Sequence, residues 1–127
     1  MMGWPKEELR KIAGADDFHI APFREDGVTY SAPTWTLSVA VDEALYARGF
    51  NGPRSNWYHA AVQQRAGRIT AAGRLKEVTF EAVDGPSSES INDLIDDAFR
   101  AKYRGSPYLN AMIGKRARAG TVKIMPR

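Results

Sequence analysis

Short strands joined by tight turns are the feature of this sequence that most limits its fold. Residues 34–41 alternate large apolar side chains with small, mostly polar ones, which is the clearest period of two in the chain. Asp26-Gly27 is the strongest short hairpin signal, because both positions tolerate a positive φ. Hairpins this short leave no room for crossover helices, so we expect an antiparallel sheet rather than a doubly wound parallel one. The apolar side chains of the alternating segment are expected to face the core: Trp35, Leu37, Val39 and Val41.

Further strands and a few helices are predicted along the rest of the chain. The predicted strands cover 16–25, a segment from 28 interrupted at Ser31-Ala32-Pro33, 34–41, 44–49, 68–72, 75–83 and 121–124. Helices are predicted over 5–13, from the turn near 53 to about 65, from Ser90 to about 104, and as a short turn over 108–113. In the strand 44–49, if Leu45 and Ala47 face inward, Tyr46 and Arg48 face a cleft. The pattern predicts an α+β, mainly β fold, in which an antiparallel sheet curls into a small barrel with three to four flanking helices.

Composition limits the class of protein. A chain of 127 residues with 43% hydrophobic and 26% charged residues is typical of one globular domain, here 1–127. Cysteine is absent, which excludes disulfides, thiolate chemistry and cysteine-ligated metals. We expect a cytoplasmic protein with no membrane partner, because no signal-peptide core or long apolar run is present.

A basic segment around a glycine-rich turn is the predicted ligand site. Residues 44–76 contain six Arg and Lys residues, and no acid follows Asp97. The turn leads into a helix start, where free backbone N–H groups and the helix dipole favour an anion such as phosphate. The candidate cofactor-binding residues are Arg48, Asn51, Gly52, Arg54, Ser55, Trp57 and Tyr58.

Each candidate also has a structural interpretation. Trp57 and Tyr58 could stack on a heterocycle, or could pack into the core one helical turn from Ala61 and Val62. Ser55 could cap its helix instead of contacting a ligand. The sequence assigns no catalytic residue and predicts no metal site, because the two histidines lack ligand spacing. Asp96-Asp97 is interpreted as a solvated helix face.

Several segments carry a resemblance to known proteins. They are Ile20-Ala21-Pro22-Phe23-Arg24, Pro33-Thr34-Trp35, the run from Asn51 to Tyr58, Lys76-Glu77-Val78-Thr79-Phe80 and Ala101-Lys102-Tyr103. Together they resemble a bacterial family of unknown function over nearly the whole chain. That family is in turn similar to deazaflavin-dependent nitroreductase-like and pyridoxamine-phosphate-oxidase-like proteins. This similarity implies a split β-barrel that binds FMN or a deazaflavin, commonly at a homodimer interface.

Three functions follow as hypotheses. The first is a flavin- or deazaflavin-binding oxidoreductase, in which Arg48, Arg54 and Ser55 hold a phosphate and Trp57 or Tyr58 lines the ring pocket. The second is a non-enzymatic module that binds a nucleotide or a nucleic acid, of which nucleic acid is the less favoured ligand. The third is a dimeric barrel without a cofactor. We expect a phosphorylated small molecule and a homodimer as partners.

Overall fold

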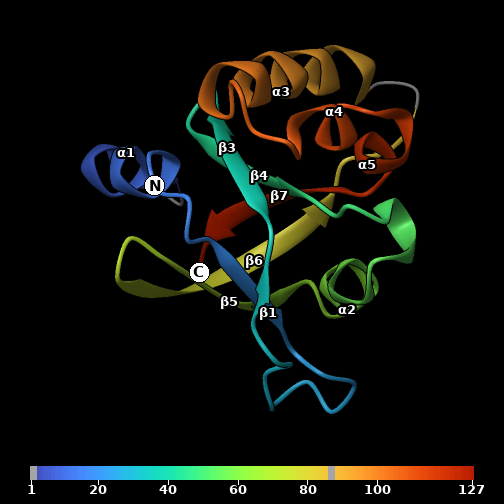
Figure 1. Cartoon of the computed structure of the whole chain (residues 1–127). Helices are drawn as coiled ribbons and strands as arrows, with labels where there is room; N and C mark the ends of the chain where they lie inside the picture. Colours follow the sequence, from blue (N-terminus) through green and yellow to red (C-terminus); the bar gives the residue numbers. More distant parts are fainter. Residues whose placement is uncertain (1–2, 86–87) are drawn as a thin grey trace.

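One antiparallel sheet of seven strands organises residues 3–85 and 88–127, which are the residues that the computed structural model describes (Figure 1). The strand order is β2-β1-β5-β6-β7-β4-β3. The strands are β1 (His19–Pro22), β2 (Thr34–Trp35), β3 (Leu37–Val41), β4 (Ala44–Arg48), β5 (Ala66–Ala71), β6 (Arg74–Ala82) and β7 (Thr121–Pro126). The helices are α1 (Lys6–Ala13), the 3-10 helix η1 (Gly52–Arg54), α2 (Asn56–Gln64), α3 (Glu89–Lys102), α4 (Leu109–Met112) and α5 (Lys115–Ala119).

The two edge strands of the sheet, β2 and β3, are separated along the chain by Thr36 alone. The Thr36 amide donates a 3.2 Å hydrogen bond to the carbonyl of Phe18, next to β1. Its hydroxyl donates a 2.6 Å bond to the carbonyl of Arg48, the last residue of β4. The sheet therefore curls as a half-barrel whose edges approach each other at Thr36, and this confirms the predicted α+β, barrel-like antiparallel fold.

The inner face of the curled sheet encloses the first core, together with α1 and α2. Leu45 and Ala47 of β4 both contribute to this core, so they share one face of the strand as the period of two predicts. The buried members of this core are Trp4, Ile12, Phe18, Ile20, Leu45, Ala47, Trp57, Tyr58, Ala61, Ile69, Ala71, Val78, Phe80, Val122 and Ile124.

The outer face of β3 and β4 is also covered, by α3, α4 and α5 on one side of the sheet (Figure 1). The buried members of this second core are Leu37, Val39, Ala44, Tyr46, Ile95, Phe99, Tyr103, Met112 and Ala117. All five residues of β4 are buried as a result. The expectation that Tyr46 and Arg48 face an open cleft is therefore wrong, because helices pack on the face opposite the barrel interior.

The prediction of Trp35 as a core residue is also wrong. The chain bends at Thr36, so Trp35 lies in β2, and 39% of its surface is exposed. Leu37 and Val39, beyond the bend, are buried as predicted.

Asp26-Gly27 forms a turn, but no strand begins at residue 28, contrary to the prediction. Gly27 has the expected positive φ of 70°. However, a carboxylate oxygen of Asp26 accepts hydrogen bonds from the amides of both Val28 and Thr29, at 2.9 Å each. Those amides are therefore not available to a strand ladder, and a single bridge from Phe23 to Tyr30 is the pairing observed there.

The free edge of β3 is capped by the end of α3. The Ser38 amide donates to the Tyr103 hydroxyl at 3.2 Å, and the Lys102 ammonium donates to the Ser38 carbonyl at 2.7 Å. The Tyr103 hydroxyl donates to the same carbonyl at 3.1 Å. Side chains thus satisfy the backbone groups that a neighbouring strand would otherwise bind.

Each of the predicted helices has a counterpart in the structure, and α5 is one that the sequence did not predict. None of the helices in the described part of the chain is long and apolar enough to cross a membrane.

Candidate functional site

The predicted site lies at a groove between η1 and α5, which we call the arginine groove. It has a volume of about 680 Å³ and is lined by Asn51, Pro53, Arg54 and Arg116. Asn51 and Arg54 belong to the predicted set, whereas Arg116 comes from α5, far along the chain. The structure thus adds a second arginine to the site.

Two glycines allow η1 and α5 to meet. Gly52 has a φ of 59°, and a Cβ at this position would lie 2.8 Å from Cγ of Arg116 and would overlap its backbone. A Cβ at Gly120, just after α5, would lie 2.7 Å from Cα of Gly52. This close backbone approach fixes the position of α5, and with it Arg116, against the turn that carries Arg54.

The arginine groove is positively charged. Among the residues that the structure describes, no acidic side chain lines it. Within residues 3–85 and 88–127, neither Arg54 nor Arg116 forms a salt bridge or a side-chain hydrogen bond, and both side chains are exposed. Two guanidinium groups without a carboxylate partner favour an anion, and a phosphate suits their planar donor geometry best.

The backbone N–H groups of the turn contribute less than predicted. The amides of Gly52, Arg54 and Ser55 already donate to the carbonyls of Gly49, Asn51 and Gly52, at 2.9, 3.2 and 3.0 Å. The hypothesis that these amides form an open phosphate cradle is therefore wrong. The charge of the groove therefore comes from the arginine side chains.

Ser55, Trp57 and Tyr58 lie inside the protein. Ser55 is buried, makes no cap hydrogen bond with its side chain, and packs against Gly49 so closely that a Cβ on the glycine would overlap it. Trp57 and Tyr58 belong to the first core, where their rings meet edge to face with centroids 6.1 Å apart. The structural interpretation of both aromatic residues is thus confirmed, and neither ring is available to stack on a cofactor in the arginine groove.

Arg48 is also buried, with 0% of its surface exposed. Its Nε donates to the Thr121 hydroxyl at 3.0 Å, and Nη1 donates to the Met112 carbonyl at 3.0 Å and to the Asp96 carboxylate. Nη2 donates to both oxygens of Asn92, at 3.2 and 3.0 Å. The proposed contact of Arg48 with a phosphate is therefore wrong, because the protein itself uses the whole guanidinium group.

The partner of Arg48 corrects a second prediction. Asp96 was expected on a solvated helix face, but it is buried and accepts charged hydrogen bonds from both Arg48 and Arg118. Burial lowers the pKa of Arg48, while the hydrogen bond and charge of Asp96 raise it. This network joins β4 to α3, α4 and β7, so its role is structural.

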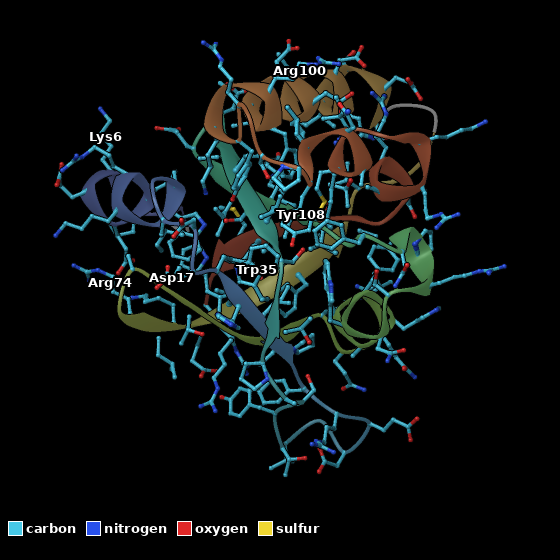
Figure 2. The ribbon with its side chains drawn as sticks, in the orientation of Figure 1. Lys6, Asp17, Trp35, Arg74, Arg100 and Tyr108 are labelled. Carbon is cyan, nitrogen blue, oxygen red and sulfur yellow. The ribbon has the colours of Figure 1, made fainter. Side chains whose placement is uncertain are left out.

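Three aromatic rings that the sequence analysis did not group together form a partly exposed cluster next to the turn that lines the groove. Phe50, the neighbour of Asn51, stacks on Trp35 with ring centroids 6.3 Å apart. Tyr108 meets both rings edge on, at 5.7 Å from Trp35 and 5.3 Å from Phe50. Figure 2 shows Trp35 and Tyr108 side by side, and 39% and 47% of their surfaces are exposed.

This aromatic cluster of Trp35, Phe50 and Tyr108 had no local sequence signal, because its members come from three distant segments. In the described parts of the chain, no group of three or more metal-ligating side chains lies close enough to hold a metal ion.

One comparison with known proteins gives a match, and two give none. No curated protein and no solved structure matches the chain. The comparisons also give no sign of a relation to the nitroreductase-like or pyridoxamine-phosphate-oxidase-like proteins. They do confirm the resemblance to a bacterial family of unknown function, since the match covers residues 8–124. The chain belongs to the family described as "Uncharacterized protein conserved in bacteria (DUF2255)".

Proposed function

We propose that the arginine groove binds the phosphate of a small aromatic cofactor, and that FMN or a deazaflavin is that cofactor. The observation that carries this proposal is the presence of Arg54 and Arg116 in one groove of about 680 Å³, whose lining in the described part of the chain contains no acid. A charged hydrogen bond contributes about 1.5 to 3 kcal/mol. Two such bonds can therefore anchor a phosphate with an affinity between about millimolar and tens of micromolar, and further affinity must come from the rest of the ligand.

The aromatic cluster supplies a surface for the ring of such a cofactor. Phe50 directly precedes Asn51, which lines the arginine groove, and Phe50 packs against Trp35 and Tyr108. Exposed aromatic side chains that already pack together lose little conformational freedom when they bind a flat heterocycle. The cluster takes over the role that the sequence gave to Trp57 and Tyr58.

The activity that follows is that of an oxidoreductase. A flavin or deazaflavin, when bound, carries out the hydride or electron transfer. The contribution of this chain is to hold the phosphate through Arg54 and Arg116 and to orient the ring on the aromatic cluster. The substrate is not defined by these residues.

Binding to purified protein tests the proposal. FMN and a reduced deazaflavin are titrated in turn, with ligand fluorescence as the signal. We expect saturable binding that weakens at least about tenfold in the double variant Arg54→Ala/Arg116→Ala. The matched control is Arg74→Ala/Arg100→Ala, which removes the same charge from the β5–β6 hairpin and α3, outside the groove lining. The proposal is overturned if neither cofactor binds, or if the control variant loses as much affinity as the double variant of the groove.

The combination of basic and aromatic side chains also suits single-stranded nucleic acid, in which bases stack on aromatic rings and phosphates bind arginines. A single-stranded oligonucleotide is therefore titrated in parallel at low and high salt. Oligonucleotide binding that falls steeply with salt, together with no cofactor binding, favours the nucleic-acid module instead.

A further inference from the structure

A second hollow is lined by two members of the aromatic cluster, Trp35 and Tyr108, and by a lysine. It has a volume of about 570 Å³ and is bordered by the bend at Thr36, the end of α3 and the segment that follows α3. Its apolar walls are Trp35, Leu37, Tyr103 and Tyr108. Its charged lining residues are Asp16, Lys102 and Arg104. We call it the lysine hollow.

The amine of Lys102 is held in a fixed position at this hollow. It donates to the Ser38 carbonyl at 2.7 Å and lies 4.9 Å from the centroid of the Tyr103 ring. Most surface lysines have no such anchor, and their amines move freely in water. A reacting partner in the lysine hollow would therefore meet an amine that is already oriented.

The surroundings of Lys102 also make its neutral form more abundant than in a lysine exposed to water. Burial lowers its pKa to about 8, although the negative charges of Asp16 and Asp17 raise it. Roughly a tenth of the side chains would then be neutral at pH 7, compared with less than a thousandth for a free lysine. When a neutral amine donates one N–H to Ser38, its lone pair remains available for bond formation.

We propose that Lys102 is a carbonyl-reactive residue and that the lysine hollow binds an aromatic aldehyde, which forms an imine with the Lys102 amine. The amine nitrogen adds to the carbonyl carbon and forms the C–N bond. The carbonyl oxygen then leaves as water, with both hydrogens supplied by the amine, so no oxidant or reductant is needed. The neutral imine has no N–H, and uptake of one proton from solvent gives a protonated imine whose single N–H can donate to the Ser38 carbonyl.

The walls of the hollow define the class of aldehyde. Trp35 and Tyr108 favour a planar ring over an aliphatic chain. Arg104 lines the same hollow, is exposed, and forms no ion pair within residues 3–85 and 88–127, so it can bind an anionic substituent on the ring. The proposed ligand is therefore an aromatic aldehyde that carries a carboxylate or a similar anion. This proposal does not depend on the cofactor proposed for the arginine groove.

Reductive trapping tests the proposal on the full chain without any flavin. The protein is incubated with 4-formylbenzoate and sodium cyanoborohydride at pH 7, and the labelled peptides are quantified by mass spectrometry. The chain has six lysines, so the other five serve as internal controls. We expect Lys102 to be labelled at least about fivefold faster than any other lysine, and Lys102→Arg to lose this fast phase.

Two comparisons identify what the hollow contributes. Propanal, which has no ring, should label Lys102 with less preference over the other lysines than 4-formylbenzoate does. The variant Tyr108→Ala should reduce labelling of Lys102 by 4-formylbenzoate, while Lys115→Arg, outside the hollow, should leave it unchanged. A thermal melt of each variant confirms that it is folded. Uniform labelling of all six lysines, or equal preference with both aldehydes, overturns the proposal.

Discussion

The hydroxyl of Thr36 donates a 2.6 Å hydrogen bond to the carbonyl oxygen of Arg48, where the two edges of the sheet approach each other. Thr36 is buried, so Thr36→Val removes the donor and leaves a buried carbonyl with one bond fewer, at nearly constant volume. We expect a loss of about 1 to 2 kcal/mol in the free energy of unfolding, measured by urea denaturation.

Thr34→Val is the control for this substitution, because Thr34 is exposed and its hydroxyl makes only a 3.5 Å contact with the Ala32 carbonyl. Its effect should stay within about 0.5 kcal/mol. Equal effects at the two threonines would contradict a special role for the bond to Arg48.

Arg48→Met should be strongly destabilising, by about 3 to 5 kcal/mol, because it leaves the buried Asp96 with one cation instead of two and removes the bonds to Asn92 and Thr121. Chemical denaturation followed by tryptophan fluorescence measures the loss. Arg100→Met removes the exposed ion pair with Asp97 and should change stability by less than about 1 kcal/mol. A mild effect of Arg48→Met, with specific loss of cofactor binding, would restore Arg48 as a ligand-binding residue.

Gly52→Ala should destabilise the protein and disturb the arginine groove together. The new methyl group would meet both an unfavourable φ of 59° and the backbone of Arg116. Gly73→Ala separates the cost of the positive φ from the cost of the overlap. Gly73 has a φ of 73°, but no described atom lies within 4 Å of the added Cβ. We expect Gly73→Ala to lower the free energy of unfolding by about 1 kcal/mol, and Gly52→Ala to lower it by at least about 2 kcal/mol more, as measured by thermal denaturation. Similar values would show that η1 and α5 are not tightly packed.

Lys102 should make stability depend on pH in a predictable direction. Its folded pKa of about 8 lies below that of a free lysine, near 10.4. Between these values the unfolded chain holds a proton that the folded chain has released, so the contribution of Lys102 to stability rises with pH. Relative to Lys102→Gln, the wild type should therefore gain unfolding free energy between pH 7.5 and about 9.5, as measured by urea denaturation at each pH. A difference that is constant or falls with pH would contradict the burial of this ammonium group.

The sequence predicted the antiparallel sheet and most of its strands, because alternation and tight turns are local signals. It also predicted that Leu45 and Ala47 lie on the face of β4 opposite Tyr46 and Arg48. It could not show that α3 covers the other side of this strand, and so it placed Arg48 in an open cleft. An arginine on a strand has the same local pattern whether a helix or solvent lies above it.

The other wrong predictions have the same cause, because a local sequence pattern does not show contacts between distant segments. The acidic pair Asp96-Asp97 in the middle of α3 resembles a solvated helix face, and nothing near Asp96 in the sequence reveals two arginines from distant segments. The arginine groove was half predicted, through Asn51 and Arg54. Its second arginine, Arg116, and its aromatic neighbours Trp35 and Tyr108 depend on contacts between elements far apart in the chain.

The cap that Lys102 and Tyr103 place on Ser38 has a consequence for the behaviour of the protein at high concentration. An uncapped strand at a sheet edge can recruit a strand from another molecule, which is how many intermolecular sheets and aggregates begin. Here the amide and carbonyl that would recruit it are already occupied. Self-association through continued β-pairing is opposed at this point of the surface, and two side chains at the end of one helix provide that protection.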